Sequence, residues 1–285
     1  MIKSILASLT GYGSDRTVLD TAMAVARIGA GHVEAFHIRL DTLEIGAIMG
    51  SVSTREDLQP LIDKTATQQD ERSRQAKAAF DDACKRHAVS SEKSSDADKV
   101  SASWKECKGI IDETFDEARY HDLAVMAREP AFSLDRLTSV LMHSGRPLLI
   151  APPKPVEALG RNVAIAWKAG PEAARALTAA MPILRRASSV SILLVSENAA
   201  GDHIDRSTAE RLAKLLNRHG IRAQVRMKYS PSGSCSHALQ EMAYNDNADL
   251  LVMGAYGHSR LRQFVFGGVT RDMLADCAIP VLLCG

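Results

Sequence analysis

The chain has 285 residues, enough for one large domain or two ordinary ones, and 46% of them are hydrophobic. Its formal net charge of +1 argues against a nucleic acid or an anionic membrane as partner. The chain holds no apolar run of the roughly 18 residues that a membrane span needs. Its first apolar run is too short for a signal peptide, so we expect a cytoplasmic protein.

Apolar, strand-like runs alternate with helical patterns along the chain. In the first half we expect strands at Lys3–Thr10, His32–Ile38, His121–Ala127 and Gly145–Pro152, and helices at Asp15–Gly29 and Thr54–His87. In the second half we expect strands at Asn162–Lys168, Val190–Val195, Ala248–Gly254 and Ala278–Gly285, and a helix at Pro171–Ala187. Apolar strands separated by helices indicate βαβ units in a parallel sheet that is covered on both faces.

The second half repeats the order of the first, since HDLAVMA matches ADLLVMG and GRPLLIAP matches AIPVLLCG. We therefore predict two tandem α/β domains, residues 1–154 and 155–285, each an open, mostly parallel five-stranded sheet flanked by helices. The proline-rich segment Ala151–Arg161 would link them. We expect the domains to pack about a pseudo-twofold axis. Their final strands, at exposed sheet edges, would pair with each other or with a second chain.

The cysteines and histidines form no recognisable redox or metal motif. The chain has five cysteines, an odd number, and no Cys-x-x-Cys pair, which favours reduced thiols. Its nine histidines show neither His-x-x-x-His nor His-Glu-x-x-His spacing. We therefore expect no dedicated metal site.

The halves differ most between their fourth and fifth strands, where the second half has six more residues and four glycines: Gly254, Gly257, Gly267 and Gly268. A glycine at the carboxyl end of a parallel strand lets the backbone turn and lets a ligand approach the main chain. A helix that begins at the last two glycines would offer unpaired N–H groups to a phosphate. The sequence thus predicts a phosphate cradle, against the alternative of ordinary turn and helix-cap glycines.

The spacing Gly254-x-x-Gly257, followed after nine residues by Gly267, resembles the Gly-2x-Gly-9x-Gly-Ser/Thr nucleotide motif of the universal stress protein family. The blocks ADLLVMGAYGHSRLRQFVFGGVTRDML, IPVLL, VAIAWKAGPEAARALTAAMPILRRA, FHIRLD and SGRPLLIAP resemble the same family, so the similarity covers almost the whole chain. The resemblance implies two Rossmann-like domains of the adenine nucleotide alpha hydrolase type. It also implies binding of ATP or another adenine nucleotide, with or without Mg²⁺.

The resemblance places the nucleotide in the second domain. Val195 would lie beside the adenine, Gly254, Tyr256 and Gly257 along the ribose and phosphates, and Gly267, Gly268 and Val269 against the phosphates through their main chain. Two residues depart from the family pattern: Lys168 replaces an aspartate that often ends the first strand, and Gly268 replaces the motif's Ser/Thr. Thr270 could supply the missing hydroxyl. Lys168 either pairs with a phosphate or is a solvated loop residue.

The first domain has Ala127 and Pro130 in place of the first two glycines, and Glu129 would repel phosphate, so we expect no nucleotide there.

No residue set resembles a catalytic site. Three functions stay open: a nucleotide-binding stress-response protein that acts by conformation or partner choice, an interaction module whose nucleotide site has decayed, and a slow ATP hydrolase. An unidentified protein partner and a homodimer are compatible with the first two.

Overall fold

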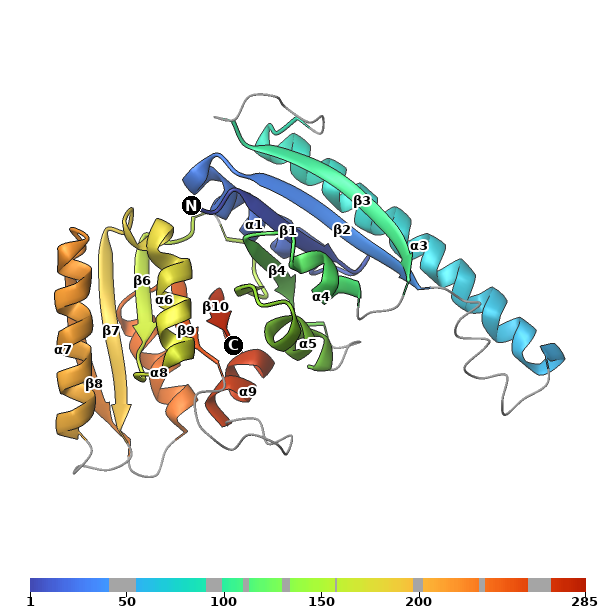
Figure 1. Ribbon diagram of the computed structural model, residues 1–285. Coiled ribbons are helices and arrows are strands. Elements are labelled where there is room, and N and C mark those ends of the chain that lie inside the picture. The colour runs from blue at the N-terminus through green and yellow to red at the C-terminus, as the bar shows by residue number, and fades with distance from the viewer. Residues whose placement is uncertain are drawn as a thin grey trace.

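The computed structural model describes residues 1–40, 55–90, 99–109, 113–129, 134–156, 158–196, 202–230, 234–255 and 268–285. The elements of the first half are β1 (Ser4–Leu9), α1 (Asp15–Gly29), β2 (His32–Leu40), α3 (Arg55–His87), β3 (Ser101–Gly109), α4 (Glu113–Ala118), β4 (Leu123–Ala127), α5 (Asp135–His143) and β5 (Leu148–Ala151). Those of the second half are β6 (Asn162–Ala166), α6 (Pro171–Leu184), β7 (Ser189–Ser196), α7 (Asp202–Arg218), β8 (Ala223–Tyr229), α8 (Cys235–Asn245), β9 (Leu250–Gly254), α9 (Gly268–Ala275) and β10 (Val281–Cys284). Figure 1 shows the two groups of elements side by side.

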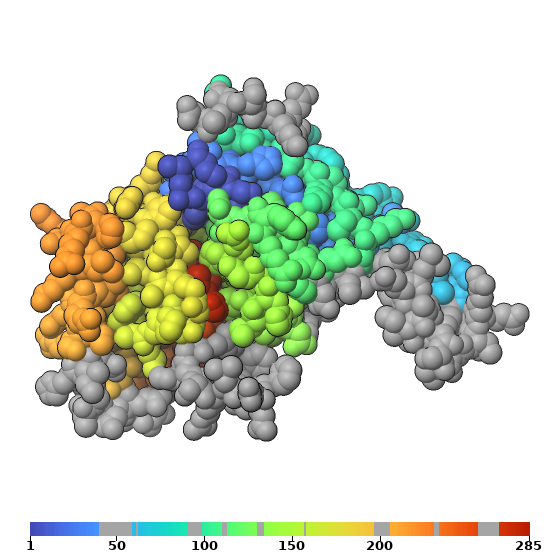
Figure 2. Space-filling model, viewed as in Figure 1, coloured from blue at the N-terminus to red at the C-terminus, as the bar shows by residue number. Residues whose placement is uncertain are grey.

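The strands form one ten-stranded sheet in the order β3-β2-β1-β4-β5-β10-β9-β6-β7-β8. Each half contributes five parallel strands, and the halves join where β5 and β10 pair antiparallel, with Leu149 opposite Leu282. The expected pairing of the two final strands is therefore confirmed, and it merges two five-stranded sheets into one. All four residues of each joining strand are buried, so this pairing removes two apolar edges from water. In the space-filling view the C-terminal residues (red) lie between the two halves (Figure 2).

Helices cover both faces of the sheet, as near-continuous apolar strands require. One core layer packs β-strand side chains against α1, α3, α6 and α7, with Leu19 and Phe80 among its buried members. The other packs them against α4, α5, α8 and α9, with Leu137 and Met273. None of the helices in the described residues combines the length and the hydropathy of a transmembrane span.

The same aspartate braces the amino end of the sheet in each half. Asp122, just before β4, accepts hydrogen bonds from the backbone N–H groups of Lys3 and Ser4 at 2.8 and 3.0 Å. Asp249, just before β9, accepts bonds from the N–H groups of residues 160–162 at 2.9–3.2 Å. The repeat seen in the sequence is thus a repeat of hydrogen bonding as well as of strands.

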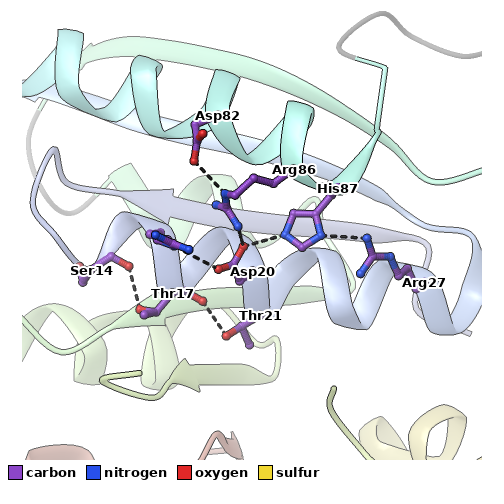
Figure 3. Close-up of polar contacts among 9 residues, drawn as sticks. Ser14, Thr17, Asp20, Thr21, Arg27, Asp82, Arg86 and His87 are labelled. Atoms are coloured by element: carbon purple, nitrogen blue, oxygen red, sulfur yellow. Dashed lines mark hydrogen bonds and ion pairs between the residues drawn. The ribbon is translucent and has the colours of Figure 1, made fainter. Parts of the chain in front are cut away.

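An ionic network centred on the buried Asp20 ties the end of α3 to α1 (Figure 3). The Asp20 carboxylate, with a side chain only 5% exposed, accepts a hydrogen bond from Arg86 and lies 2.6 Å from His87 Nε2. Arg86 also donates to Asp82 at 2.8 Å, and Arg27 contacts His87 Nδ1 at 2.8 Å. These contacts hold a polar helix against the core with charge pairs, where its own sequence offers few apolar side chains.

Candidate functional site

Three of the predicted site residues lie at the same edge of the sheet. β6 lies between β7 and β9 and is parallel to both. Lys168 follows β6 by two residues and is exposed, Val195 is the penultimate residue of β7, and Gly254 is the last residue of β9. Because carboxyl ends of parallel strands meet at one edge, these positions line the place where open α/β sheets bind ligands. Tyr256, Gly257 and Gly267 lie outside the described residues.

Gly254 is required by packing between β9 and α6. A Cβ at this position would lie 2.5 Å from the backbone N of Ala173 and 2.8 Å from the carbonyl carbon of Glu172. The strand end therefore touches the first turn of α6 so closely that no side chain fits. This contact explains the glycine without a ligand, which is the ordinary structural role that the sequence left open for it.

Gly268 has a different environment, since no atom of the described residues lies within 4 Å of where its Cβ would be. It is exposed and begins α9, whereas Val269 is half-buried and Thr270 is buried. The first turn of α9 carries no acidic residue. The partial positive charge of this helix end is therefore not offset by a carboxylate of its own first turn, and none of the described side chains fills the space beside Gly268.

The other end of α9 is held by the first half of the chain. The Arg128 guanidinium donates hydrogen bonds to the carbonyl oxygens of Met273 and Leu274 at 2.6 Å each and of Cys277 at 3.1 Å. Burial lowers the pKa of Arg128. A cation on the last carbonyls of a helix satisfies acceptors that have no partner within the helix. Arg128, one residue after β4, thus positions the helix whose amino end carries Gly268.

The corresponding edge of the first half is occupied by the chain's own side chains. Asp15, at the start of α1, is buried and accepts hydrogen bonds from the N–H groups of Thr10 and Gly11 at 2.8 Å each. It also accepts one from the Thr10 hydroxyl at 3.2 Å. Burial raises the pKa of the Asp15 carboxyl, although these hydrogen bonds oppose the rise. In the second half, Ala173 stands at the position of Asp15.

A second carboxylate and a buried cation complete this first-half cluster. Glu129 accepts hydrogen bonds from the hydroxyls of Ser14 and, at 3.3 Å, Thr10. Burial raises the pKa of Glu129, and nearby Asp15 raises it further. Burial lowers the pKa of the Arg136 guanidinium to about 10, against the attraction of both carboxylates. Glu129 and Asp15 thus place two acidic groups at this edge, and the expectation that Glu129 repels a phosphate stays a prediction.

A cavity of about 420 Å³ lies next to this cluster. Its lining includes Ser14, Glu129 and Arg136 from the first half and Ala275 and Asp276 from the second. It therefore meets the carboxyl end of α9. Gly268 is at the other end of that eight-residue helix, about 12 Å away at 1.5 Å per residue. The cavity and the predicted phosphate cradle are separate places.

Sequence reasoning missed Asp15, Arg136 and Arg128. Asp15 could have been found by aligning the two halves, because Ala173 replaces it at the same distance from the strand. Arg128 gave no signal, since its partners are main-chain carbonyls of residues more than 140 positions away.

Comparisons with known proteins agree with this architecture. Residues 161–285 match the model of the universal stress protein family. A curated relative, a universal stress protein of the cyanobacterium Synechocystis, is 36% identical over 69 residues. That match covers 24% of this chain and 23% of the relative, so the aligned part is under a quarter of either protein.

Two solved structures resemble almost the whole chain. A universal stress protein from Archaeoglobus fulgidus aligns with a TM-score of 0.67 and 16% identity, over 98% of this chain and 95% of that one. A putative universal stress protein from Pseudomonas aeruginosa aligns with a TM-score of 0.60 and 14% identity, over 99% and 93%. At such identities these likenesses establish the fold of the full chain.

Proposed function

We propose that the chain binds an adenine nucleotide, ATP foremost, in its second half, because residues 161–285 match the model of the universal stress protein family. The ligand would lie along Val195, Gly254, Tyr256 and Gly257, with its phosphates on the main chain of Gly267, Gly268 and Val269. Lys168 and, if the helix end rearranges, Thr270 would add polar contacts. Mg²⁺ would accompany the phosphates.

The observation that carries this proposal is the contrast between the first turns of α9 and α5. α9 begins with the exposed Gly268, whose Cβ position meets no described residue within 4 Å, and has no acidic residue in its first turn. α5 has Asp135 at the matching position, and Glu129 and Asp15 lie close by. A helix N-terminus favours a phosphate only where no carboxylate competes for it. We therefore propose a single nucleotide per chain, in the second half.

We also propose that the protein acts in the cytoplasm as a stress-response protein, through conformation or the choice of a protein partner. Its domains would be residues 1–154 and 155–285. Arg128 supports a conformational route, because any shift of α9 on ligand binding would strain its three hydrogen bonds to the end of that helix. A homodimer would form through exposed surface rather than through β5 and β10, which already pair with each other.

Titration calorimetry with ATP and Mg²⁺ on Gly268→Asp and Gly268→Asn tests the site. Neither side chain would meet a described residue at this position, and both residue types are favourable at a helix start, so we expect the fold to be retained. The Asp variant, which copies the first half, should bind ATP more than about tenfold more weakly than the Asn variant, because its charge repels phosphate. Asp135→Gly is the matched control in the first half and should leave the ATP affinity unchanged. If the two Gly268 variants bound ATP with equal affinity, the phosphates would not lie at the start of α9.

Lys168→Asp tests the role of the lysine. An exposed lysine that contacts no phosphate can be replaced by aspartate with unchanged or tighter binding, whereas loss of affinity identifies a phosphate contact. If the wild-type protein binds no adenine nucleotide at all, the alternative function becomes the conclusion: an interaction module whose nucleotide site has decayed. The departures at Lys168 and Gly268 are the observations that favour this alternative.

A further inference from the structure

A second polar cluster lies at the amino ends of the first-half strands, the edge opposite to the candidate nucleotide site. It consists of Glu34 from β2, Glu117 from α4 and His121, which precedes β4 by two residues. One ligand-type atom from each of these side chains lies within 4.8 Å of the others. His121 is buried, and both carboxylates are about four-fifths buried, with exposed fractions of 22% and 20%. Carboxylates so far from water need a cation.

The two distances from the histidine nitrogen fit a small divalent ion. His121 Nε2 lies 3.6 Å from Glu34 Oε1 and 3.7 Å from Glu117 Oε1. Ligand atoms about 2.1 Å from a tetrahedral Zn²⁺ lie roughly 3.4 Å from one another. Among the described side chains, Glu34 Oε1 is a buried oxygen without a hydrogen bond. It faces the histidine nitrogen at a distance too long for a hydrogen bond, and an ion between them would satisfy both atoms.

The surroundings of His121 have the form that metal-binding histidines use. Its Nδ1 lies 2.8 Å from the Ser4 hydroxyl. When Nδ1 carries the proton and donates it to Ser4, Nε2 presents its lone pair to the two carboxylates. Ser4 is itself held by the bond from its N–H to Asp122. The ring orientation is therefore set before any ion binds.

In this structure the Lys105 ammonium is the cation that lies beside the two carboxylates of the cluster. Its ammonium lies 2.7 Å from Glu117 Oε2 and 3.8 Å from Glu34 Oε1. Its side chain is 43% exposed, so it can swing into solvent and open the cluster to an ion. We propose that Glu34, Glu117 and His121 form a site for a divalent transition-metal ion such as Zn²⁺, which takes water at its remaining position and displaces Lys105.

The second half of the chain has the same fold but lacks this cluster. By strand pairing and by the alignment of Asp122 with Asp249, Ser191 replaces Glu34, Tyr244 replaces Glu117 and Ala248 replaces His121. Arg226 stands at the position of Lys105 and pairs with Asp246 at 3.0 Å instead. The fold therefore does not need these ligands, because its other copy has none of them. The site was missed in the sequence because its single histidine shows no paired spacing.

The test is titration of the full-length, nucleotide-free protein with Co²⁺, followed by its visible absorption bands, and with Zn²⁺ by calorimetry. The wild type should bind one ion. His121→Gln and Glu117→Gln should weaken binding more than about 100-fold, and Ser4→Ala about tenfold. Lys105→Met should tighten binding by about tenfold, because it removes the competing charge. Arg226→Met is the matched second-half control and should change nothing.

The gain in metal affinity expected from Lys105→Met distinguishes a metal site from a cluster that serves only as an ion pair. If the cluster is only an ion pair, that variant loses stability and gains no metal affinity, which overturns the proposal. Unchanged binding in both His121→Gln and Glu117→Gln would also overturn it, because the ion would then sit elsewhere. Circular dichroism of every variant shows that it is folded. Neither outcome depends on whether the protein binds a nucleotide.

Discussion

The two halves of the molecule share one framework and differ at the carboxyl ends of their strands. Both halves brace the amino end of the sheet with the same aspartate, Asp122 or Asp249, and both lay helices on the two faces. At the other edge the first half places Asp15, Glu129 and Arg136, which interact with one another. At the aligned sequence positions the second half has Ala173, Tyr256 and Val269, of which Tyr256 lies outside the described residues.

This difference teaches that a cluster of the chain's own charges can occupy the position of a ligand. In the first half, the N–H groups after β1 donate to Asp15 and are no longer available to a phosphate. The Arg136 guanidinium offsets part of the charge of the two carboxylates there. The second half has neither carboxylate at the aligned positions, and α9 begins with a glycine. The same framework thus carries its own charged cluster in one copy and not in the other.

The largest expected effect comes from removing the cation of the first-half cluster. Arg136→Met leaves the buried Asp15 and the half-buried Glu129 without their nearby cation, and we expect a loss of about 3–5 kcal/mol in the free energy of unfolding. Val269→Met, at the matching position of α9, should cost less than about 1.5 kcal/mol, because an apolar side chain replaces another. Urea unfolding followed by circular dichroism measures both. If the two variants lost the same free energy of unfolding, the charges of the first-half cluster would not stabilise one another.

A smaller effect distinguishes the two strand ends. Gly254→Ala introduces a Cβ 2.5 Å from a backbone nitrogen of α6, so we expect a destabilisation of about 1–3 kcal/mol. The first half accommodates Ala127 at this position, and Ala127→Gly should cost only about 0.5–1 kcal/mol through backbone entropy. Thermal unfolding of both variants provides the comparison. A Gly254→Ala variant that keeps wild-type stability but loses ATP would return this glycine to the role of a ligand contact.

The smallest effect depends on pH. Burial raises the pKa of Glu129 above its ordinary value of 4.5, so the folded state holds this proton more tightly than the unfolded chain. The wild type therefore loses stability from this group as pH rises from 4.5 through the raised pKa. Glu129→Gln keeps an acceptor for the Thr10 and Ser14 hydroxyls but does not titrate. Its stability relative to wild type should increase between pH 4.5 and 7 by a few tenths to about 1 kcal/mol.

Denaturant unfolding at a series of pH values checks this difference. A constant difference across the range would show that Glu129 titrates equally in the folded and unfolded states. The same series on Asp135→Asn, at the exposed start of α5, serves as a control for a carboxylate outside the cluster.

Much of the fold could be predicted from the sequence, because the central strands are buried on both faces and appear as short apolar runs. The expected strand Lys3–Thr10 became β1 at Ser4–Leu9, and Ala248–Gly254 became β9 at Leu250–Gly254. The edge strands β3 and β8 were not predicted. β8 alternates exposed and half-buried residues, and β3 has exposed polar side chains in its middle, so neither forms an apolar run.

The sequence by itself determined the repeat, the parallel α/β architecture and the glycine-rich segment, because these depend on local periodicity and on residue types within one stretch of chain. Only the tertiary structure decided which charged side chains meet. The first-half cluster joins residues more than 110 positions apart, and His121, Glu34 and Glu117 come from three separate elements. It also decided that Gly254 is needed for packing and Gly268 is not, since a glycine's purpose depends on which atoms lie where its side chain would be.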